Sequence, residues 1–500
     1  MRTLLHTNSR PRTDGVRSPN ANWRSRFWSD MENLSAALEN ARTLSQIVGV
    51  DEPVAAEMLS CTISISFDPH DTRAVWLASY IGLLLGRTVR KVSLNVTEPS
   101  DILEIVLGHC AKRTRLQLTV YVGASFGQLK IATSGRTGEF DESFHPALLM
   151  LASCYVSAFV LRISVLRSAT GLPLRDPMLI DLETLPGYSR FADLSPITMP
   201  VGTFLAGAGA IGNAFIWALQ AFEVNGTLTI CDPDVVSPGN LNRCVLFKGT
   251  DVGQLKAETL AREARKILPN LTLRSEPVEL SKVRERSGRQ WLRQLIIAVD
   301  SRRTRRRLQR EIPGEVYDAS TTGVQELVLH FNRQPDVLAC LGCIYKEDEG
   351  ERLHEAHVAE ALGVDAEDVQ NGWITPAAAQ AIASKYVTLQ PEQLVGIAYD
   401  TLFKQLCGQQ ALTVEADKQV LAPFAFVSAL AGIYLAIEFV LRNQSSHSER
   451  FNYWRASPWA EPNPRAMTLR PQDPQCGVCS DPVYNRVARA LWEFRVQPAR

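Results

Sequence analysis

The stretch Thr203-Phe-Leu-Ala-Gly-Ala-Gly-Ala-Ile-Gly212 decides the fold. Its first four residues indicate an apolar strand, and we expect an apolar helix over residues 214–222, beyond the three glycines. In such a strand–turn–helix unit, Gly207 permits the tight turn, Gly209 lets the backbone approach a phosphate or ribose, and Gly212 lets helix pack against strand. Alone, the pattern predicts a nucleotide-binding α/β fold and does not separate ATP from NAD or FAD.

Two carboxylates end the next predicted strand, residues 228–231. Asp232 lies about 20 residues past the glycine turn, where an acid can accept hydrogen bonds from ribose hydroxyls. Asp234 follows two positions later and is assigned to the same nucleotide site. A dehydrogenase would need no more than this, so NAD remains an alternative on these residues.

Further charged side chains favour ATP. The loop after the second strand carries Asn240, Arg243 and Lys256, and these residue types suit the clamping of a polyphosphate and its developing charge. A third strand, expected over residues 295–299, ends in Asp300, another carboxylate that suits Mg²⁺ beside phosphate oxygens. Together these features predict ATP with Mg²⁺ rather than NAD.

In this order, the motifs resemble the ThiF/MoeB adenylyltransferases and the adenylation domains of ubiquitin-activating enzymes. The resemblance runs from the glycine loop to the C-terminal cysteine pair. Two departures remove no charged group, because Cys244 stands where the family usually has glutamine and Ser301 where it usually has asparagine. The other matching elements are Asp232 with Asp234, the Asn-Leu-Asn-Arg run ending at Arg243, Gly253 with Lys256, and Asp300 with Arg305.

The resemblance implies a doubly wound, Rossmann-like adenylation domain and a role for each matching residue. Asp232 would hold the ribose. The phosphates would be bound by Asn240, Arg243 and Lys256, of which the last two would also serve catalysis. Asp300 would hold the magnesium ion and so take part in the chemistry as well.

Composition sets the outer limits. The chain has 500 residues, 45% hydrophobic and 21% charged, which predicts a globular protein with two or three domains. Its 53 basic and 53 acidic residues cancel, so we expect neither a nucleic-acid nor a membrane partner. Ten scattered cysteines without a preceding signal peptide favour a reducing, cytoplasmic location.

Residues 27–195 indicate a second α/β unit without a catalytic edge. Where a glycine loop should follow its first strand, the sequence reads Asp68-Pro-His-Asp71, whose charges and proline are hostile to a phosphate. The resemblance implies an inactive adenylation-like domain fused to an active one, and an unrelated α/β partner domain is the alternative. Strands are expected at 62–67, 91–96 and 116–122, and helices at 73–85, 101–110 and 146–165.

The rest of the chain divides around this pair of units. Residues 1–26 are a basic tail expected to be disordered, with an organellar transit peptide as the alternative. The active domain takes residues 196–345 and 419–500, and a helical crossover insertion separates its two parts at residues 346–418.

Two apolar runs, residues 146–161 and 420–437, approach the length of a membrane span. The second contains Pro423 and Gly432, and the first is shorter and stops at Arg162. Both are better interpreted as helices packed against a sheet.

Two CxxC pairs predict a metal site. Cys340 with Cys343 and Cys476 with Cys479 supply four thiolates, which suit tetrahedral Zn²⁺ with no open position. The pairs lie too far apart for a local zinc finger, but the family shows the same separation, with the metal joining the crossover to the C-terminal end. The predicted role is structural, and redox chemistry is the alternative.

The crossover insertion also holds a candidate nucleophile. Helices are expected over residues 353–362 and 375–386, and a third from Gln393 would end at Cys407 and its following glycine. The family places its thioester cysteine in this region, so Cys407 would accept an acyl group. A buried free cysteine is the alternative.

Two sets of arginines are candidates for the same site. Tyr188-Ser-Arg190 resembles the helix whose arginine reaches the ATP of the opposite half, although a surface arginine is the alternative. In the basic run of residues 302–307, only Arg305 is expected to face the site, and the others would be solvated or meet an acidic partner.

The predicted function is ATP-dependent activation of a ubiquitin-like protein with a C-terminal glycine. Its carboxylate would be adenylated, passed to Cys407 as a thioester and transferred to a ubiquitin-conjugating-like enzyme. The main alternative is adenylation of a sulfur-carrier protein or peptide without an enzyme thioester. An NAD-dependent oxidoreductase and a non-catalytic scaffold are the remaining alternatives.

Overall fold

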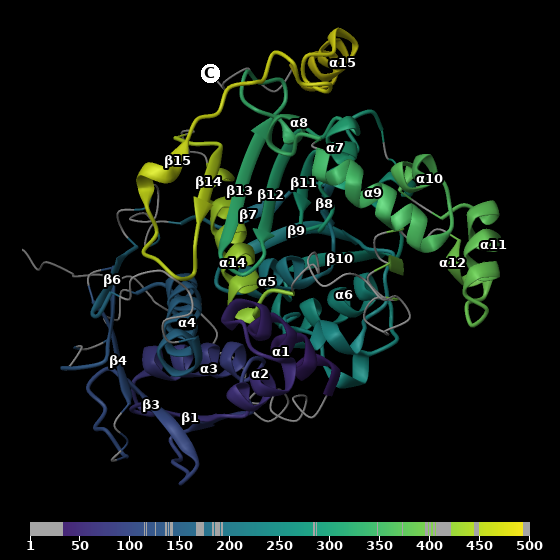
Figure 1. The fold of residues 1–500 in the computed structure, drawn as a ribbon. Coiled ribbons are helices and arrows are strands. Elements are labelled where there is room, and N and C mark those ends of the chain that lie inside the picture. Colours follow the sequence, from purple (N-terminus) through teal and green to yellow (C-terminus); the bar gives the residue numbers. More distant parts are fainter. Residues whose placement is uncertain are drawn as a thin grey trace, which may run out of the picture.

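The computed structural model contains two β-sheets that pack together through a layer of helices (Figure 1). We call residues 34–182 the N-terminal unit and residues 194–493 the C-terminal unit. Within 34–493 the structure describes all residues except 115, 117, 126, 136–137, 139, 141–143, 167–174, 183–184, 186–190, 192–193, 284–285, 287, 348, 373, 396–398, 400–401, 404–405, 407–421 and 445–449.

Helices separate and cover the strands of both sheets. In chain order they are α1 Leu34–Val48, α2 Glu52–Leu59, α3 Thr72–Leu85, α4 Pro146–Leu161, α5 Ala210–Leu219, α6 Lys256–Ile267, α7 Arg302–Arg310, α8 Leu341–Ile344, α9 Glu349–Leu362, α10 Ala366–Asn371, α11 Pro376–Lys385, α12 Pro391–Leu394, α14 Ala425–Arg442 and α15 Pro482–Trp492.

The smaller sheet belongs to the N-terminal unit and has the strand order β2-β1-β3-β4-β5-β6. Its first four strands are parallel and the last two antiparallel. The strands are β1 Thr62–Ser66, β2 Lys91–Leu94, β3 Asp101–Leu107, β4 Thr119–Ser125, β5 Gln128–Ala132 and β6 Met178–Asp181.

The helix predicted over residues 101–110 is wrong, because this segment is the central strand β3. It pairs with β1 on one side and β4 on the other. Leu103 and Ile105 point into the core while Glu104 lies on the opposite face and is also buried. Burial on both faces hides the alternation that marks a strand, so the apolar run also fitted a helix.

The larger sheet belongs to the C-terminal unit, with the order β10-β9-β8-β11-β12-β13-β14-β15 and β7 beside β9. The strands from β10 to β12 are parallel, as is β7, and β13 to β15 are antiparallel. The strands are β7 Ile197–Met199, β8 Thr203–Ala206, β9 Val224–Cys231, β10 Leu271–Glu276, β11 Gln294–Ile297, β12 Glu315–Thr322, β13 Glu326–Arg333, β14 Tyr453–Ala456 and β15 Met467–Thr468.

Helices cover both faces of the larger sheet, which confirms the predicted doubly wound α/β class. Leu205 and Ile296 join the main core beneath α5 and α14. Phe204 and Leu295, their neighbours along the strands, join a second cluster that includes Leu308 of α7. This alternation follows from the two-residue period of a strand.

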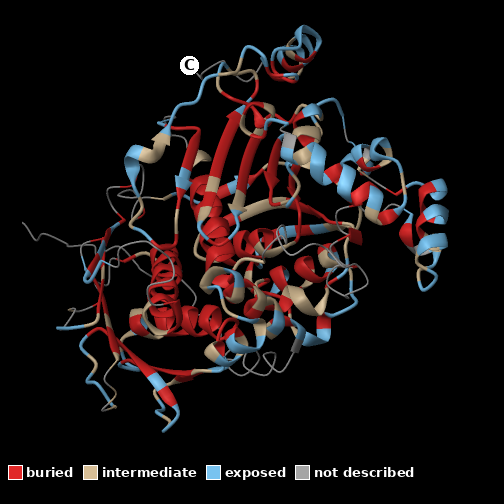
Figure 2. Ribbon diagram, viewed as in Figure 1, coloured by how far each residue is buried: buried red, intermediate tan, exposed pale blue. Residues whose placement is uncertain are grey.

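The two sheets share a topology. In each, a first strand leads into a buried helix (α3 or α5), a parallel set ends in an antiparallel hairpin, and a long apolar helix (α4 or α14) precedes the next strand. These four helices form the buried layer between the sheets (Figure 2). The C-terminal unit adds α6 with β10, and α7.

The long helices α4 and α14 contact each other at the centre of the molecule. The Tyr155 and Tyr434 hydroxyls lie 2.8 Å apart in a fully buried hydrogen bond. The same four residues, Phe-Val-Leu-Arg, lie at 159–162, across the end of α4, and at 439–442, at the end of α14. The units therefore meet through corresponding elements.

Both helices satisfy the length and hydropathy requirements of a membrane span. The two segments are Pro146–Leu166, which includes a π-helical turn, and Ala425–Arg442. Of the residues in their most apolar stretch, 89% and 94% are buried inside the protein. Such burial supports the interpretation of both as core helices.

The crossover insertion forms a small helical lobe, α9 to α12, with its own apolar core. It extends from the C-terminal unit beside α7 (Figure 1). Arg306 of α7 makes two hydrogen bonds with Glu351, at 2.7 and 2.9 Å, and Arg303 pairs with Glu355. The acidic partner predicted for the basic run therefore lies in the same chain.

Candidate active site

The glycine turn lies where β8 meets α5. Gly207 has φ of +100°, and a Cβ on Gly212 would stand 2.2 Å from the Gly207 carbonyl oxygen, so side chains are excluded at both positions. A Cβ on Gly209 would have no described atom within 4 Å. The helix begins at Ala210, four residues earlier than predicted, so its first turn faces this open space.

The α5 N-terminus carries no side-chain cap among the described residues. Its first backbone N–H groups therefore keep their hydrogen-bonding capacity, and the helix dipole adds partial positive charge. A helix start of this kind, next to open space, suits a phosphate group.

Asp232 follows β9 directly and is buried. Its carboxylate accepts hydrogen bonds from the backbone N–H groups of Ala208, at 2.7 Å, and Asp234, at 2.9 Å. Burial raises the pKa of Asp232 to about 6; Lys256 opposes this shift, and Asp234 adds to it. The carboxylate thus binds the glycine turn and keeps further lone pairs for ribose hydroxyls.

Lys256 is the first residue of α6 and pairs with Asp234 at 2.8 Å. Burial disfavours its charge, but Asp232 and Asp234 outweigh that effect and raise the pKa of the lysine. The two acids therefore hold an ammonium group beside the glycine turn.

Asn240 lies within a 3-10 helix, Pro238–Asn242, and Arg243 follows directly after it. Arg243 is partly exposed, and one of its terminal nitrogens donates to the Asn242 side chain at 2.7 Å and to the Gly239 carbonyl at 3.3 Å. The Asn240 side chain accepts the Ser237 backbone N–H at 3.0 Å and so caps this helix.

Strand register brings the predicted residues to one edge of the sheet. Ala206, the last residue of β8, is paired with Cys231 on one side and Ile297 on the other. Gly207 and Asp232, the next residues of their strands, therefore lie side by side at the carboxyl edge of the sheet. Asp300 lies three positions beyond Ile297 and is exposed. An exposed carboxylate at this edge fits a Mg²⁺ ligand.

Arg305 reaches this edge from within the core, because its guanidinium donates to the carbonyl of Val299, directly before Asp300. It is fully buried, pairs with Asp318 and donates to the carbonyl of Ala319 at 3.0 Å. Burial opposes its charge, yet Asp318 and Tyr345 raise the pKa of the guanidinium. Arg305 thus joins strand ends behind the site. Ser301, which stands where the family usually has asparagine, caps α7 by accepting the Thr304 N–H.

The corresponding edge of the smaller sheet is built differently. Asp71 caps α3 by accepting the N–H groups of Arg73 and Ala74, at 2.9 and 3.0 Å. Asn95, directly after β2, accepts the Phe67 N–H at 3.0 Å, as Asp232 accepts that of Ala208. An amide thus replaces the acid, and a carboxylate occupies the helix start.

The carboxylate of Glu104, in β3, binds the end of β1 and the loop after β3 at the same edge. It accepts hydrogen bonds from the Ser66 hydroxyl, the Arg113 N–H and both the N–H and hydroxyl of Thr114. Burial opposes its ionisation, but the bonds from Thr114, Arg113 and Ser66 hold the pKa of Glu104 below its ordinary value. The loop after β3 is thereby fixed to the sheet.

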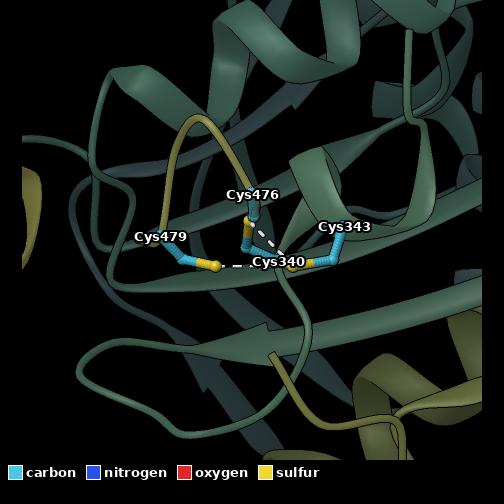
Figure 3. A group of neighbouring side chains, drawn as sticks. All are labelled: Cys340, Cys343, Cys476 and Cys479. Carbon is cyan, nitrogen blue, oxygen red and sulfur yellow. Dashed lines mark hydrogen bonds between the residues drawn. The ribbon is translucent and has the colours of Figure 1, made fainter. Parts of the chain in front are cut away.

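The structure brings the four predicted metal ligands together (Figure 3). All four are buried, and their sulfur atoms lie within 4.8 Å of one another. The Cys340 Sγ lies 3.8 Å from that of Cys343 and 3.7 Å from that of Cys476, and the Cys343 Sγ lies 3.4 Å from that of Cys479.

These separations exceed the length of about 2.05 Å of a disulfide bond, so the four side chains are thiols. Four converging sulfurs fit structural Zn²⁺ with no open coordination position. The cluster joins the start of α8 to the segment before α15, as the family resemblance implies. The zinc ion itself remains a prediction.

Three predictions lie outside the described residues. They concern the nucleophile Cys407, the Tyr188-Ser-Arg190 arginine and the basic tail at residues 1–26. The helix predicted from Gln393 is described in parts. The helix α12 spans Pro391–Leu394, a turn follows at Val395, and Tyr399, Leu402, Phe403 and Leu406 are helical.

Sequence reasoning missed the role of Asn242. It stood in the quoted Asn-Leu-Asn-Arg run without an assignment, yet it is fully buried and holds Arg243. Its position immediately before the arginine was the available signal. Its partner on the other side, Asn40, gave none, since it lies 202 residues away in the chain.

The glycine turn, strand-end acid and half-buried lysine define the C-terminal unit as a nucleotide-binding α/β domain. A family model described as the ThiF family matches residues 201–478, more than half of the chain. The chain belongs to the ThiF family.

Several relatives cover different parts of the chain. The uncharacterized protein y4jF of Sinorhizobium fredii is 26% identical over 460 residues, 86% of this chain and 85% of that protein. Ubiquitin-activating enzyme E1 1 of Schizosaccharomyces pombe is 38% identical over 76 residues, 14% of this chain and 8% of that enzyme. Adenylyltransferase and sulfurtransferase UBA4 of Meyerozyma guilliermondii is 38% identical over 79 residues, 16% of this chain and 18% of that protein.

Among solved structures, Escherichia coli MccB with MccA-N7isoASN aligns with a TM-score of 0.34 and 16% identity. The alignment covers 56% of this chain and 67% of that one.

Proposed function

We propose that the protein uses ATP to adenylate the C-terminal carboxylate of a ubiquitin-like modifier. One observation carries the proposal: the uncapped start of α5 lies beside a strand-end acid and a half-buried lysine at the same sheet edge. The short matches to ubiquitin-activating enzymes support a ubiquitin-like substrate.

The charged groups at this edge suit the chemistry of the first step. A carboxylate oxygen of the modifier attacks the α-phosphorus of ATP, a C–O–P linkage forms, the bond to the β-phosphate oxygen breaks, and pyrophosphate leaves. Lys256 and Arg243 would stabilise charge that moves onto the departing phosphates, and the N–H groups of α5 would bind the α-phosphate region. Mg²⁺ at Asp300 would supply further neutralisation when bound.

The second step is assigned to Cys407. Its thiolate would attack the acyl carbon of the adenylate, AMP would leave, and a thioester would form for transfer to a ubiquitin-conjugating-like enzyme. The position of Cys407 in the sequence, within the crossover insertion where the family resemblance puts the thioester cysteine, supports this assignment.

We assign the N-terminal unit the place of a second, inactive adenylation domain. The shared strand order and the pairing of α4 with α14 support this assignment. The Asp71 cap and the Asn95 amide argue that it binds no ATP, because the positions of a phosphate and a ribose ligand are filled or uncharged.

A second candidate function is adenylation of a sulfur-carrier protein or peptide without an enzyme thioester. The match to UBA4, named both adenylyltransferase and sulfurtransferase, supports it as well as the other short matches support the first. The two candidates share the ATP step and differ only at Cys407.

ATP–pyrophosphate exchange tests the shared step, with purified β-grasp proteins ending in glycine as substrates. Lys256→Met is expected to lower the exchange rate by about 10²–10³-fold, because it removes a positive group next to the phosphates. Lys91→Met, which breaks the Lys91–Glu98 pair of the N-terminal unit, is the matched control. No exchange with any modifier would favour a scaffold and refute both candidates.

Non-reducing gels then separate the two candidates. A thiol-labile adduct with the modifier should form in wild type and in Cys110→Ala, a half-buried cysteine of the N-terminal unit, and be lost in Cys407→Ala. An adduct that survives in Cys407→Ala would contradict the assignment of the nucleophile. Exchange without any adduct in wild type would favour the sulfur-carrier alternative.

A further inference from the structure

The N-terminal unit contacts the loop that carries Arg243. The guanidinium of Arg87, just after α3, donates to three backbone carbonyls on the loop. They belong to Leu241, Val245, at 3.1 Å, and Phe247, at 2.9 Å. Because these carbonyls flank Arg243 on both sides, the path of its backbone is set by the other unit.

A chain of side-chain hydrogen bonds leads from the same place to the guanidinium of Arg243. The Nδ2 of Asn40, on α1, donates to the Arg87 carbonyl at 2.6 Å. The Nδ2 of Asn242 donates to the Oδ1 of Asn40 at 3.0 Å, and Arg243 donates to the Oδ1 of Asn242 at 2.7 Å. We call these three bonds the amide relay.

The relay has one workable direction. An amide offers donors on one end and an acceptor on the other, whereas a guanidinium only donates. If the Asn242 amide turned over, its NH₂ group would face the Arg243 guanidinium, and its oxygen would face the oxygen of Asn40. Asn40 therefore favours the orientation of the Asn242 amide in which its oxygen accepts from Arg243.

Burial makes the relay hard to replace with water. Asn40 and Asn242 are 1% and 0% exposed, so an amide that loses its partner stays unsatisfied. Arg243 is partly exposed and has five N–H donors. Its hydrogen bonds to Asn242 and Gly239 both come from the same terminal nitrogen, and among the described residues the other nitrogens make none. The relay thus fixes one side of the guanidinium and leaves it a face for a ligand.

We infer that Asn40 is a positioning residue that holds Arg243 at the phosphate site from the other unit of the chain. The inference rests on the proposed ATP site. It gives the N-terminal unit a direct part in nucleotide affinity without any contact of its own with the nucleotide.

Isothermal titration of full-length protein with α,β-methylene-ATP tests the relay. Asn40→Ala is expected to weaken binding about tenfold, the loss typical of a hydrogen bond to a charged group. The matched control is Thr43→Val on the same helix, which removes the 2.7 Å bond from Thr43 to the Ala422 carbonyl and leaves the relay intact. It should bind like wild type.

A double-mutant cycle separates positioning from general loss of structure. In an Arg243→Ala background, Asn40→Ala should cause no further loss, because the group it positions is gone. Asn242→Ala, which cuts the relay at its other end, should lose the same tenfold alone and no more in combination with Asn40→Ala. Circular dichroism confirms that each variant is folded.

The outcomes separate the relay from the proposed function. If wild type does not bind the analogue, the ATP site and the relay both fall. Wild-type binding with an unchanged Asn40→Ala, or equal losses in Asn40→Ala and Thr43→Val, overturns the relay alone. A tenfold loss that persists in the Arg243→Ala background also overturns it.

Discussion

At the carboxyl edge of the larger sheet, a glycine turn leaves the start of α5 open and Asp232 ends the neighbouring strand. At the same edge of the smaller sheet, Asp71 occupies the start of α3 and Asn95 ends the neighbouring strand. Both strand-end side chains accept a backbone N–H from the first loop, so the architecture is preserved while the charge differs.

The difference teaches that one fold can keep or lose a ligand through a few groups at a sheet edge. A helix start needs a hydrogen-bond acceptor, and either a bound phosphate or a side-chain carboxylate satisfies it. In the C-terminal unit the position is left for a ligand, and in the N-terminal unit Asp71 fills it. Fold alone would have assigned both units the same activity.

Among the described residues the four-cysteine cluster lies in the C-terminal unit, and its disruption gives the largest expected effect. Cys343→Ser should lose the metal and lower the free energy of unfolding by on the order of 4 kcal/mol, because the join between α8 and the C-terminal segment is lost. Chemical denaturation and zinc analysis measure both quantities. Cys110→Ser, in the N-terminal unit, is the control; equal stability of the two variants would contradict a structural metal.

Gly209→Asp should convert the open edge into a closed one. A side chain fits sterically at residue 209, and a carboxylate there would cap α5 as Asp71 caps α3. Repulsion of the nucleotide should weaken ATP binding by on the order of a hundredfold or more. Titration calorimetry measures the loss, and Gly209→Ala provides the uncharged control. Equal affinities of the two variants would show that the charge at the helix start does not separate the units.

The pH dependence should distinguish Asp232 from Asn95, which does not titrate. Since burial raises the pKa of Asp232 to about 6, ATP affinity should fall as pH drops below 6, by roughly tenfold at pH 5. For the unliganded protein, the free energy of unfolding changes with pH in the opposite direction to ATP affinity. The raised pKa contributes stability below the unfolded value of about 3.9, and this contribution is lost as pH rises through about 6.

Calorimetric titrations with ATP at pH 5 and pH 7.5 check the binding side of this prediction, and denaturant unfolding without ATP at the same pH values checks the stability side. An affinity that stays constant across the range would mean that the ionised Asp232 does not accept bonds from the nucleotide.

Asp71→Ala gives the smallest expected effect. It removes the cap of α3 and should cost about 1 kcal/mol of stability, as N-cap truncations do. ATP affinity should not change, because α3 starts at the closed edge. Paired unfolding and binding measurements test this; a change in ATP affinity would indicate that nucleotide also occupies the N-terminal unit.

The sequence was informative where function depends on neighbouring residues. The glycine turn, Asp232 and the CxxC pairs each lie within a few positions of the element that defines them, so spacing sufficed. The prediction for β3 was wrong because an apolar run that is buried on both faces shows no two-residue period in the sequence. The Phe-Val-Leu-Arg repeat stands in the sequence, but only the fold shows that it lies at the ends of two corresponding helices.

The remaining features depend on contacts between distant segments. Asn40 and Arg87 reach the Arg243 loop from the other unit, and no local pattern marks them. The basic run of α7 predicted an acidic partner without identifying Glu351 or Glu355. The position of Arg305 shortly after Asp300 predicted a place at the site, but its guanidinium pairs with Asp318 in the core.

The hydroxyl contact between Tyr155 and Tyr434 joins two units that are made in a single round of translation. Such a pair assembles in a fixed one-to-one ratio, and diluting the protein does not separate its members. Because each edge has its own residues in the chain, a substitution at one sheet edge leaves the other unchanged, and the two edges can carry different charges.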